Sequence, residues 1–214
     1  MRKVLLALVM QFILAMTPAV AAPLRIAALG DSLVHGFGLI ESDGFVPQLQ
    51  VWLKEHGSDA VVANFGVSGD TTAGGAARAD WSLTDDIGAM IVVLGGNDVL
   101  RGLDPAQSRA NLRQILLAAQ GKEVEVLLVG MEAPGNYGPD YKADFDSIYA
   151  DLAEEFDTLL YPYFFTALSD RVGDLEQVRE VMQDDGIHPN RKGVRLIVED
   201  IGPSVLDLVE RASK

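Results

Sequence analysis

Two separate places in the sequence hold the residue types that together perform nucleophilic catalysis. Ser32 follows an apolar run at residues 24–29 and a glycine, so it stands where a buried strand turns into its loop. Far along the chain, Asp185 and His188 are three residues apart. In a turn, this spacing lets the carboxylate hold one imidazole nitrogen while the other accepts a proton from a serine hydroxyl. The pattern suggests a serine nucleophile, a histidine base and an aspartate that orients the base.

Each of these signals also has a simpler interpretation. Asp-Ser before a helical stretch is common helix-capping chemistry, and a histidine just before the last helix can cap that helix. The other histidines are His35, one helical turn past Ser32, and His56, at a predicted helix C-terminus where imidazole favours the helix dipole. We interpret His56 as structural. Because no carboxylate near His35 is as well placed as Asp185, we assign the role of base to His188.

The chemistry requires these residues to meet at one edge of a sheet. Short apolar runs predict strands at residues 24–29, 60–65, 90–94, 124–129 and 158–161. Helical patterns lie between or after them at residues 45–56, 105–120, 141–156 and 191–211. Strands that alternate with helices predict a parallel sheet covered on both faces. We therefore expect an α/β fold, a three-layer α/β/α sandwich around a mainly parallel, flavodoxin-like sheet of five strands.

Several residues predict where the helices begin and end. Asp43 is a candidate cap for the helix at residues 45–56, and Asp104 followed by proline predicts the start of the next helix. Gly121 predicts the end of that helix. Gly202 and Pro203 fall inside the last helix and are expected to kink or divide it.

Two further loops at the same edge could donate hydrogen bonds to an anion. In residues 66–72, glycines precede helix-capping residues, a pattern that leaves backbone N–H groups pointing at the edge of the sheet. After the third strand, Gly95 and Gly96 bring the backbone close, and Asn97 adds a side-chain amide with two donors. Ordinary turn chemistry explains each loop equally well.

A loop rich in glycine and proline follows the fourth strand, at residues 131–139. Its apolar side chains could form one wall of a substrate groove whose other wall comes from Leu33 and residues 37–40. The candidates for the first wall are Met131, Ala133, Pro134 and Tyr137. The alternative is a loop packed rigidly on the sheet edge, with Tyr137 as a core aromatic residue.

Taken together, these motifs resemble GDSL-type members of the SGNH hydrolase family, over nearly the whole chain after residue 21. The motifs that carry the resemblance lie at residues 30–33, 64–71, 95–98, 133–138 and 183–190. The resemblance implies Ser32 as nucleophile, His188 as general base and Asp185 as its orienting acid. It further implies an oxyanion hole made by the backbone N–H groups of Ser32 and Gly69 and the side-chain amide of Asn97.

The function expected from this resemblance is hydrolysis of carboxylic esters or thioesters of small molecules through an acyl-enzyme, without metal or cofactor. One alternative is a carbohydrate acetylesterase with the same triad, which a groove of stacked aromatic side chains would favour. Another is a non-catalytic flavodoxin-like binding module, but the chain lacks both common phosphate-binding glycine motifs. An α/β-hydrolase is disfavoured because Val34 stands where its nucleophile turn needs glycine.

The N-terminal residues have the composition of a secretory signal peptide. Arg2 and Lys3 precede an apolar stretch at residues 4–16, and Ala-Val-Ala at residues 19–21 resembles a cleavage signal. We therefore expect export, to the periplasm, with residues 22–214 as one hydrolase domain and no stable membrane anchor. An uncleaved N-terminal anchor is the alternative.

Composition narrows the partners further. The chain has no cysteine, which excludes disulfides and thiol catalysis, and its formal net charge of −14 argues against nucleic acid or an anionic membrane as a partner. We expect a monomer.

Overall fold

The strands form one parallel sheet, as the apolar runs predict. The computed structural model describes residues 22–171 and 175–214, and in these parts it contains a sheet of five strands in the order β2-β1-β3-β4-β5. Every pair of neighbouring strands is parallel. The strands are β1 Arg25–Gly30, β2 Val61–Gly66, β3 Ile87–Val93, β4 Glu125–Val129 and β5 Leu159–Tyr161. All the predicted strands are therefore confirmed.

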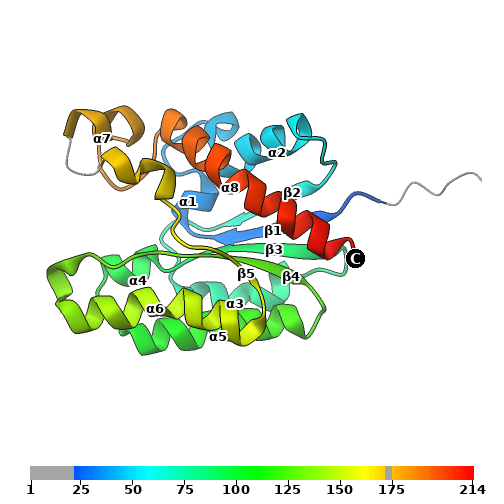
Figure 1. The fold of residues 1–214 in the computed structure, drawn as a ribbon, viewed down its shortest axis with the longest axis horizontal. Helices are drawn as coiled ribbons and strands as arrows, with labels where there is room; N and C mark the ends of the chain where they lie inside the picture. The colour runs from blue at the N-terminus through cyan, green and yellow to red at the C-terminus, as the bar shows by residue number, and fades with distance from the viewer. Residues whose placement is uncertain (1–21, 172–174) are drawn as a thin grey trace, which may run out of the picture.

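Helices cover both faces of this sheet, which confirms the three-layer prediction. Figure 1 shows α2 and α8 on one side, and α3, α5 and α6 on the other. The helices are α1 Ser32–His35, α2 Phe45–Glu55, α3 Thr72–Ser82, α4 Gly96–Leu100, α5 Pro105–Gln120, α6 Pro139–Phe156, α7 Leu175–Val181 and α8 Arg191–Ala212. Short 3₁₀ segments are η1 Glu41–Asp43, η2 Gly135–Tyr137 and η3 Thr166–Arg171.

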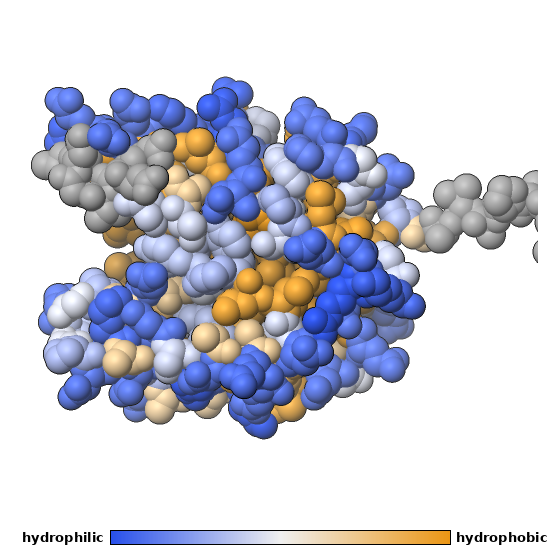
Figure 2. Space-filling model, viewed as in Figure 1, coloured by the Kyte–Doolittle hydropathy of each residue, from blue (hydrophilic) through white to orange (hydrophobic). Residues whose placement is uncertain are grey.

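Burial on both faces explains why the strands read as continuous apolar runs. Every side chain at residues 26–29 of β1 and 89–93 of β3 is fully buried. The edge strand β5 is short, and Figure 2 shows an apolar strip between the two layers of hydrophilic helices where this edge lies. None of the helices in the described parts of the chain is long and apolar enough to cross a membrane.

The carboxyl ends of the strands lie on the left in Figure 1, where α1, α4 and α7 gather. In the space-filling view the surface is notched at that end, between α7 and the helical layer below (Figure 2). Open α/β sheets bind ligands at this edge. The loops that the sequence analysis singled out therefore converge on one surface.

The predicted start of α5 is confirmed, and the predicted cap of α2 is wrong. Asp104 accepts a hydrogen bond from the N–H of Ala106 at 2.9 Å, as a capping side chain should. Asp43, in contrast, ends η1, and Gly44 takes the capping position of α2 without a side-chain bond. The carboxylate of Asp43 instead pairs with Arg191 at 3.3 Å. A contact between distant parts of the chain thus replaces the local one.

The last helix is not divided. α8 runs unbroken past Gly202 and Pro203. Pro203 lies on the exposed side of α8, so water can satisfy the carbonyl of Glu199, which loses its helical donor there. On the opposite side, Ile201 and Val205 are fully buried and hold both halves of the helix against the sheet.

Candidate active site

Ser32 is the first residue of the short helix α1, and only Asp31 separates it from the end of β1. Asp31 caps this helix by accepting a hydrogen bond from the N–H of Leu33 at 2.9 Å. Position 30, just before Asp31, requires glycine, because a Cβ atom there would collide with the side chain of Val34. The tight turn therefore places Ser32 at the carboxyl edge of the sheet.

The structure brings Ser32, Asp185 and His188 into one hydrogen-bonded line, although Ser32 is far from the other two in sequence. His188 Nε2 lies 2.8 Å from Ser32 Oγ, and His188 Nδ1 lies 2.7 Å from Asp185 Oδ2. The other carboxylate oxygen accepts the backbone N–H groups of Ile187 at 2.9 Å and of His188 at 3.0 Å. The turn between Asp185 and His188 thus fixes the orientation of both side chains.

These hydrogen bonds set the protonation of the pair. The backbone N–H of His188, followed by its ring, lowers the pKa of Asp185 to about 2. The carboxylate is therefore ionised at neutral pH, and the nitrogen that faces it, Nδ1, carries a hydrogen. Nε2 is left with its lone pair toward the hydroxyl of Ser32. This arrangement can remove a proton from Ser32 and stabilise the imidazolium that forms.

Gln183 anchors the segment that carries His188. Its backbone N–H donates to the carbonyl of His188 at 2.8 Å, and its side-chain amide donates to the carbonyls of Phe37 at 2.8 Å and Pro189 at 3.1 Å. The ring of Phe37 lies 4.7 Å from the imidazole, centroid to centroid. The sequence analysis included Gln183 in a motif without giving it a role, because a polar loop residue does not by itself indicate its partners.

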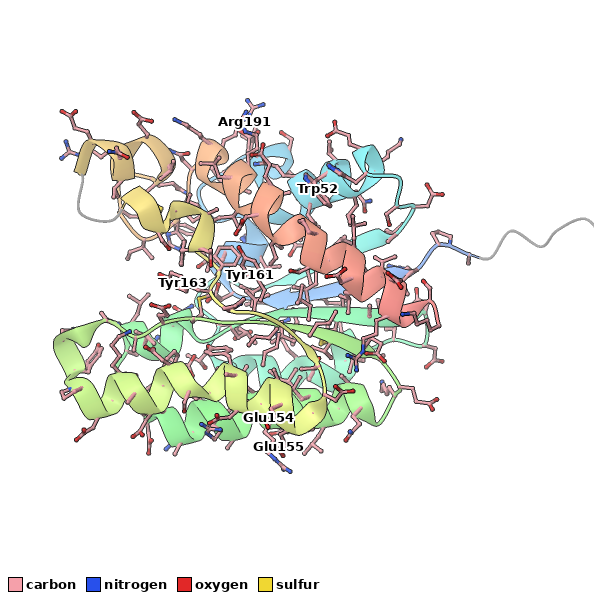
Figure 3. The ribbon with its side chains drawn as sticks, in the orientation of Figure 1. Trp52, Glu154, Glu155, Tyr161, Tyr163 and Arg191 are labelled. Atoms are coloured by element: carbon pink, nitrogen blue, oxygen red, sulfur yellow. The ribbon has the colours of Figure 1, made fainter. Side chains whose placement is uncertain are left out.

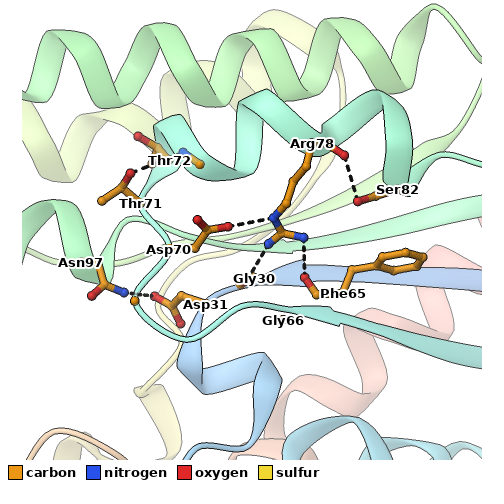
Figure 4. Close-up of polar contacts among 12 residues, drawn as sticks. Gly30, Asp31, Phe65, Gly66, Asp70, Thr71, Thr72, Arg78, Ser82 and Asn97 are labelled. Atoms are coloured by element: carbon orange, nitrogen blue, oxygen red, sulfur yellow. Dashed lines mark hydrogen bonds and ion pairs between the residues drawn. The ribbon is translucent and has the colours of Figure 1, made fainter.

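The three groups expected to donate to an oxyanion all line one cavity beside Ser32. The N–H of Ser32 belongs to the first helical residue, which has no partner inside α1. Gly69 adopts a positive φ of 83°, a conformation that favours glycine. Asn97 is the second residue of α4, and its side-chain amide donates to Asp31 Oδ2 at 3.0 Å (Figure 4). One N–H of that amide is fixed by Asp31, and this orients the other.

Asp31 is a buried carboxyl group that accepts hydrogen bonds from two donors. It is only 2% exposed, and burial raises its pKa to about 6 against the hydrogen bonds from Leu33 and Asn97. The charge of Asp70 opposes ionisation of Asp31, and a protonated His188 ring, as it forms during proton transfer, favours it. Asp31 therefore joins the turn at Ser32 to the side chain of Asn97.

Arg78, which no motif indicated, ties together the ends of β1 and β2 (Figure 4). Its guanidinium donates to the carbonyls of Gly30 at 2.9 Å and Phe65 at 2.7 Å, and it pairs with Asp70 at 2.8 Å. Both charged side chains are less than one-fifth exposed. A long, charged side chain among the small residues of the Ala- and Gly-rich helix α3 is the signal that could have identified it.

The cavity that contains Ser32 has a volume of about 550 Å³. Its apolar wall includes Leu33, Phe37, Leu100, Met131, Pro134 and Ile187. Leu33 and Pro134 therefore lie where the groove prediction places them. Ala133 is buried and Ile40 is exposed, and neither lines the cavity.

Tyr137 does not reach this cavity, so the groove prediction is wrong for that side chain. Its ring packs against Tyr141 with a centroid distance of 4.9 Å and against Gly102, and it is 41% exposed. The alternative of a core aromatic is also wrong. The Tyr137 hydroxyl lies 3.5 Å from the backbone carbonyl of Leu100, and Leu100 lines the cavity.

The sequence analysis gave no role in the cavity to Glu132, Tyr163 and Phe165, which all line it. Tyr163 and Phe165 follow β5, and Figure 3 shows Tyr163 just beyond Tyr161 at the end of that strand. The run of aromatic residues there indicates burial but does not indicate which rings face the core. Phe164, between them, is the buried one.

The remaining histidines have other partners. His35 Nδ1 lies 3.1 Å from Ser68 Oγ, and His56 Nδ1 lies 2.8 Å from the carbonyl of Trp52, with the two rings stacked. The structural interpretation of His56 is confirmed. Within residues 22–171 and 175–214, no group of three His, Cys, Asp or Glu side chains could hold a metal ion.

Comparison with known proteins shows which family the chain belongs to. A family model described as GDSL-like Lipase/Acylhydrolase family matches residues 28–196. The chain belongs to this family. Membership makes it a hydrolase of the ester-cleaving class, and the resemblance drawn from its motifs is confirmed.

Individual relatives cover nearly the whole chain. Esterase TesA of Pseudomonas aeruginosa is 37% identical over 88% of this chain and 91% of its own. Thioesterase 1/protease 1/lysophospholipase L1 of Escherichia coli is 36% identical over 94% of this chain and 93% of its own. Among solved structures, the SGNH-hydrolase family esterase AlinE4 is 40% identical, with a TM-score of 0.70 over 87% of this chain and 96% of that chain.

Proposed function

We propose that the protein hydrolyses carboxylic esters and thioesters through an acyl-enzyme formed on Ser32. The observation that carries the proposal is the line from Asp185 through His188 to Ser32, with distances of 2.7 and 2.8 Å. A hydroxyl, an imidazole and an ionised carboxylate in that order form the catalytic unit of serine hydrolases.

In the first half of the reaction, Ser32 Oγ attacks the substrate carbonyl carbon while His188 Nε2 takes the hydroxyl proton. The imidazolium, stabilised by Asp185, then gives this proton to the departing oxygen or sulfur, which leaves as an alcohol or thiol. In the second half, water attacks the acyl group, His188 takes its proton, and Ser32 is released with its proton restored.

The negative charge of each tetrahedral intermediate falls on the former carbonyl oxygen. We assign its donors as the N–H groups of Ser32 and Gly69 and the amide of Asn97, which line the same cavity. Removing one such donor typically costs ~2.7–4 kcal/mol of transition-state stabilisation.

We further propose that the apolar wall binds the acyl chain. Relatives named as an esterase, a thioesterase, a lysophospholipase and an arylesterase act on acyl groups with different leaving groups, which supports an acyl site shared by several ester classes. A carbohydrate acetylesterase is less well supported, because the rings of Tyr163 and Phe165 meet edge to face, at 61°, and form no flat stacking surface.

The sequence pattern of residues 1–21, which lie outside the described residues, supports a further proposal of export to the periplasm. In that compartment the protein would act as a monomer without a stable membrane anchor. N-terminal sequencing of the protein from a periplasmic extract tests the export. A chain that begins at Met1 would contradict cleavage.

The test of the hydrolase mechanism is turnover of p-nitrophenyl esters by the wild type and three variants. Ser32→Ala and His188→Ala should each lower kcat by up to ~10⁶-fold with an unchanged circular-dichroism spectrum, because nucleophile and base act as one unit. His35→Ala is the matched histidine control and should retain most of the activity. Comparable loss in His35→Ala with activity kept in His188→Ala would reassign the base.

A further inference from the structure

The substrate cavity carries a negative charge that the hydrolytic mechanism does not use. Among the described residues that line the cavity, none is lysine or arginine, and the carboxyl groups are Asp31 and Glu132. Asp31 is buried, and its carboxyl oxygens already accept hydrogen bonds from the Leu33 N–H and the Asn97 amide. The side chain of Glu132 is 53% exposed, so it faces solvent and ligand. Glu132 is therefore the acidic group that a substrate can meet.

Among the side chains that the structure describes, the cation paired with Glu132 is Lys142, and it does not neutralise Glu132. Lys142 Nζ lies 4.0 Å from the Glu132 carboxylate but 2.6 Å from that of Asp146, and it donates to the carbonyl of Ala133 at 2.8 Å. Lys142 is thus held by Asp146 on its own helix. Two carboxylates share one ammonium group, and the local charge that remains is close to −1.

Two aromatic rings lie in the same cavity as this charge. Tyr163 and Phe165 meet edge to face, with centroids 5.8 Å apart. Burial raises the pKa of Tyr163, and the negative charges of Glu132 and then Asp146 raise it further, so the field of Glu132 reaches this ring. A carboxylate combined with aromatic faces is the environment in which proteins bind organic ammonium groups.

We propose that Glu132, together with Tyr163 and Phe165, makes the cavity select esters by charge. Substrates with an ammonium group near the scissile bond are favoured over neutral ones, and anionic substrates are disfavoured. The net charge of −14 on the chain acts in the same direction. This proposal rests on the proposed ester hydrolysis at Ser32, and it names the class of substrate that the site prefers.

The test compares three butyrate esters of nearly equal shape by acid release at constant pH. One is butyrylcholine, the second replaces its trimethylammonium group by tert-butyl, and the third carries a sulfonate at that place. At low salt, the wild type should give a kcat/KM for butyrylcholine about threefold to tenfold above that of the tert-butyl ester, with the sulfonate lowest. Raising the ionic strength should shrink both differences.

Glu132→Gln should bring the three values together while kcat/KM for the tert-butyl ester stays within about twofold of the wild type. The matched control is Glu154→Gln, which removes the same charge from the exposed far end of α6 (Figure 3) and should keep the wild-type preference. An unchanged preference in Glu132→Gln, or equal use of all three esters by the wild type, overturns the proposal. Absence of turnover with every ester refutes ester hydrolysis at Ser32 instead, so the two failures are distinguishable.

Discussion

Replacing Asp31 by asparagine should stabilise the protein at neutral pH. The pKa of this carboxyl is about 6 in the folded protein against 3.8 for the ordinary group, because burial disfavours its charge. A carboxyl whose pKa is raised on folding binds more protons in the native state, so its contribution to stability falls as pH rises between these two values. The ionised form is therefore a cost at neutral pH.

The size of this effect follows from the shift. About two pKa units correspond to about 3 kcal/mol, present in full above about pH 7 and absent below about pH 4. An asparagine is neutral at every pH, but it accepts more weakly than a carboxylate and cannot serve both donors equally well. Loss of one such hydrogen bond costs about 1 kcal/mol of stability. The net gain in the free energy of unfolding at pH 8 is therefore expected to be about 2 kcal/mol.

Urea unfolding followed by circular dichroism measures this directly. The stability of Asp31→Asn relative to the wild type should rise by about 2–3 kcal/mol from about pH 4 to about pH 8 and then level off. The control is Asp144→Asn, which removes one charge from the exposed surface of α6. A difference that is constant with pH, or that falls as pH rises, would refute the argument.

Other substitutions test the remaining parts of the site. Asn97→Ala should lower kcat by ~10²–10³ with little change in KM, as steady-state kinetics will show, because its amide is assigned to charge present only in the transition state; a loss confined to thermal stability would contradict this. Arg78→Met should lower the free energy of unfolding in urea by about 3 kcal/mol, since Asp70 is left partly buried without its partner, and an effect below about 1 kcal/mol would contradict it. Pro134→Ala should flatten the increase in kcat/KM from acetyl to hexanoyl esters, in which each buried methylene is worth up to ~0.8 kcal/mol; an equal loss for every chain length would assign the loop to support of the catalytic residues.

Much of the fold could be predicted because each of its strands is a short apolar run bounded by turn residues. In a parallel sheet the loops after the strands share one edge, so predicting the strands also predicts that Ser32, Gly69 and Asn97 approach one another. Asp185 and His188 form a local pair, whose contact depends mainly on spacing. These predictions use short-range patterns, which a single sequence carries well.

The predictions that failed, and the site residue that the sequence analysis missed, depend on contacts between distant residues. Asp43 pairs with Arg191 from α8 and leaves the cap of α2 to a glycine. Arg78 reaches two strand ends that are apart in sequence, and no local pattern marks such a contact. Tyr137 is apolar enough for either a core or a groove, and only the path of the backbone through η2 decides that it faces neither.

The residues that line the cavity were hard to predict for the same reason. Glu132 and Tyr163 lie on loops after different strands, and each could equally be a surface residue or part of a wall. The charge of Glu132 and the ring of Tyr163 enter one cavity only because β4 and β5 are neighbouring strands whose ends lie side by side. Selectivity for substrate is therefore the feature of this protein least accessible from its sequence.

The measurement that tests the account most directly is the site of covalent modification by a serine-directed organophosphorus ester, located by peptide mass spectrometry. One adduct per chain should form, on the peptide that contains Ser32, and activity should fall in proportion to it. Ser32→Ala should give no adduct, and His188→Ala should give it far more slowly. Stoichiometric modification of another residue, or full inhibition with Ser32 unmodified, would contradict the assignment of Ser32 as the nucleophile.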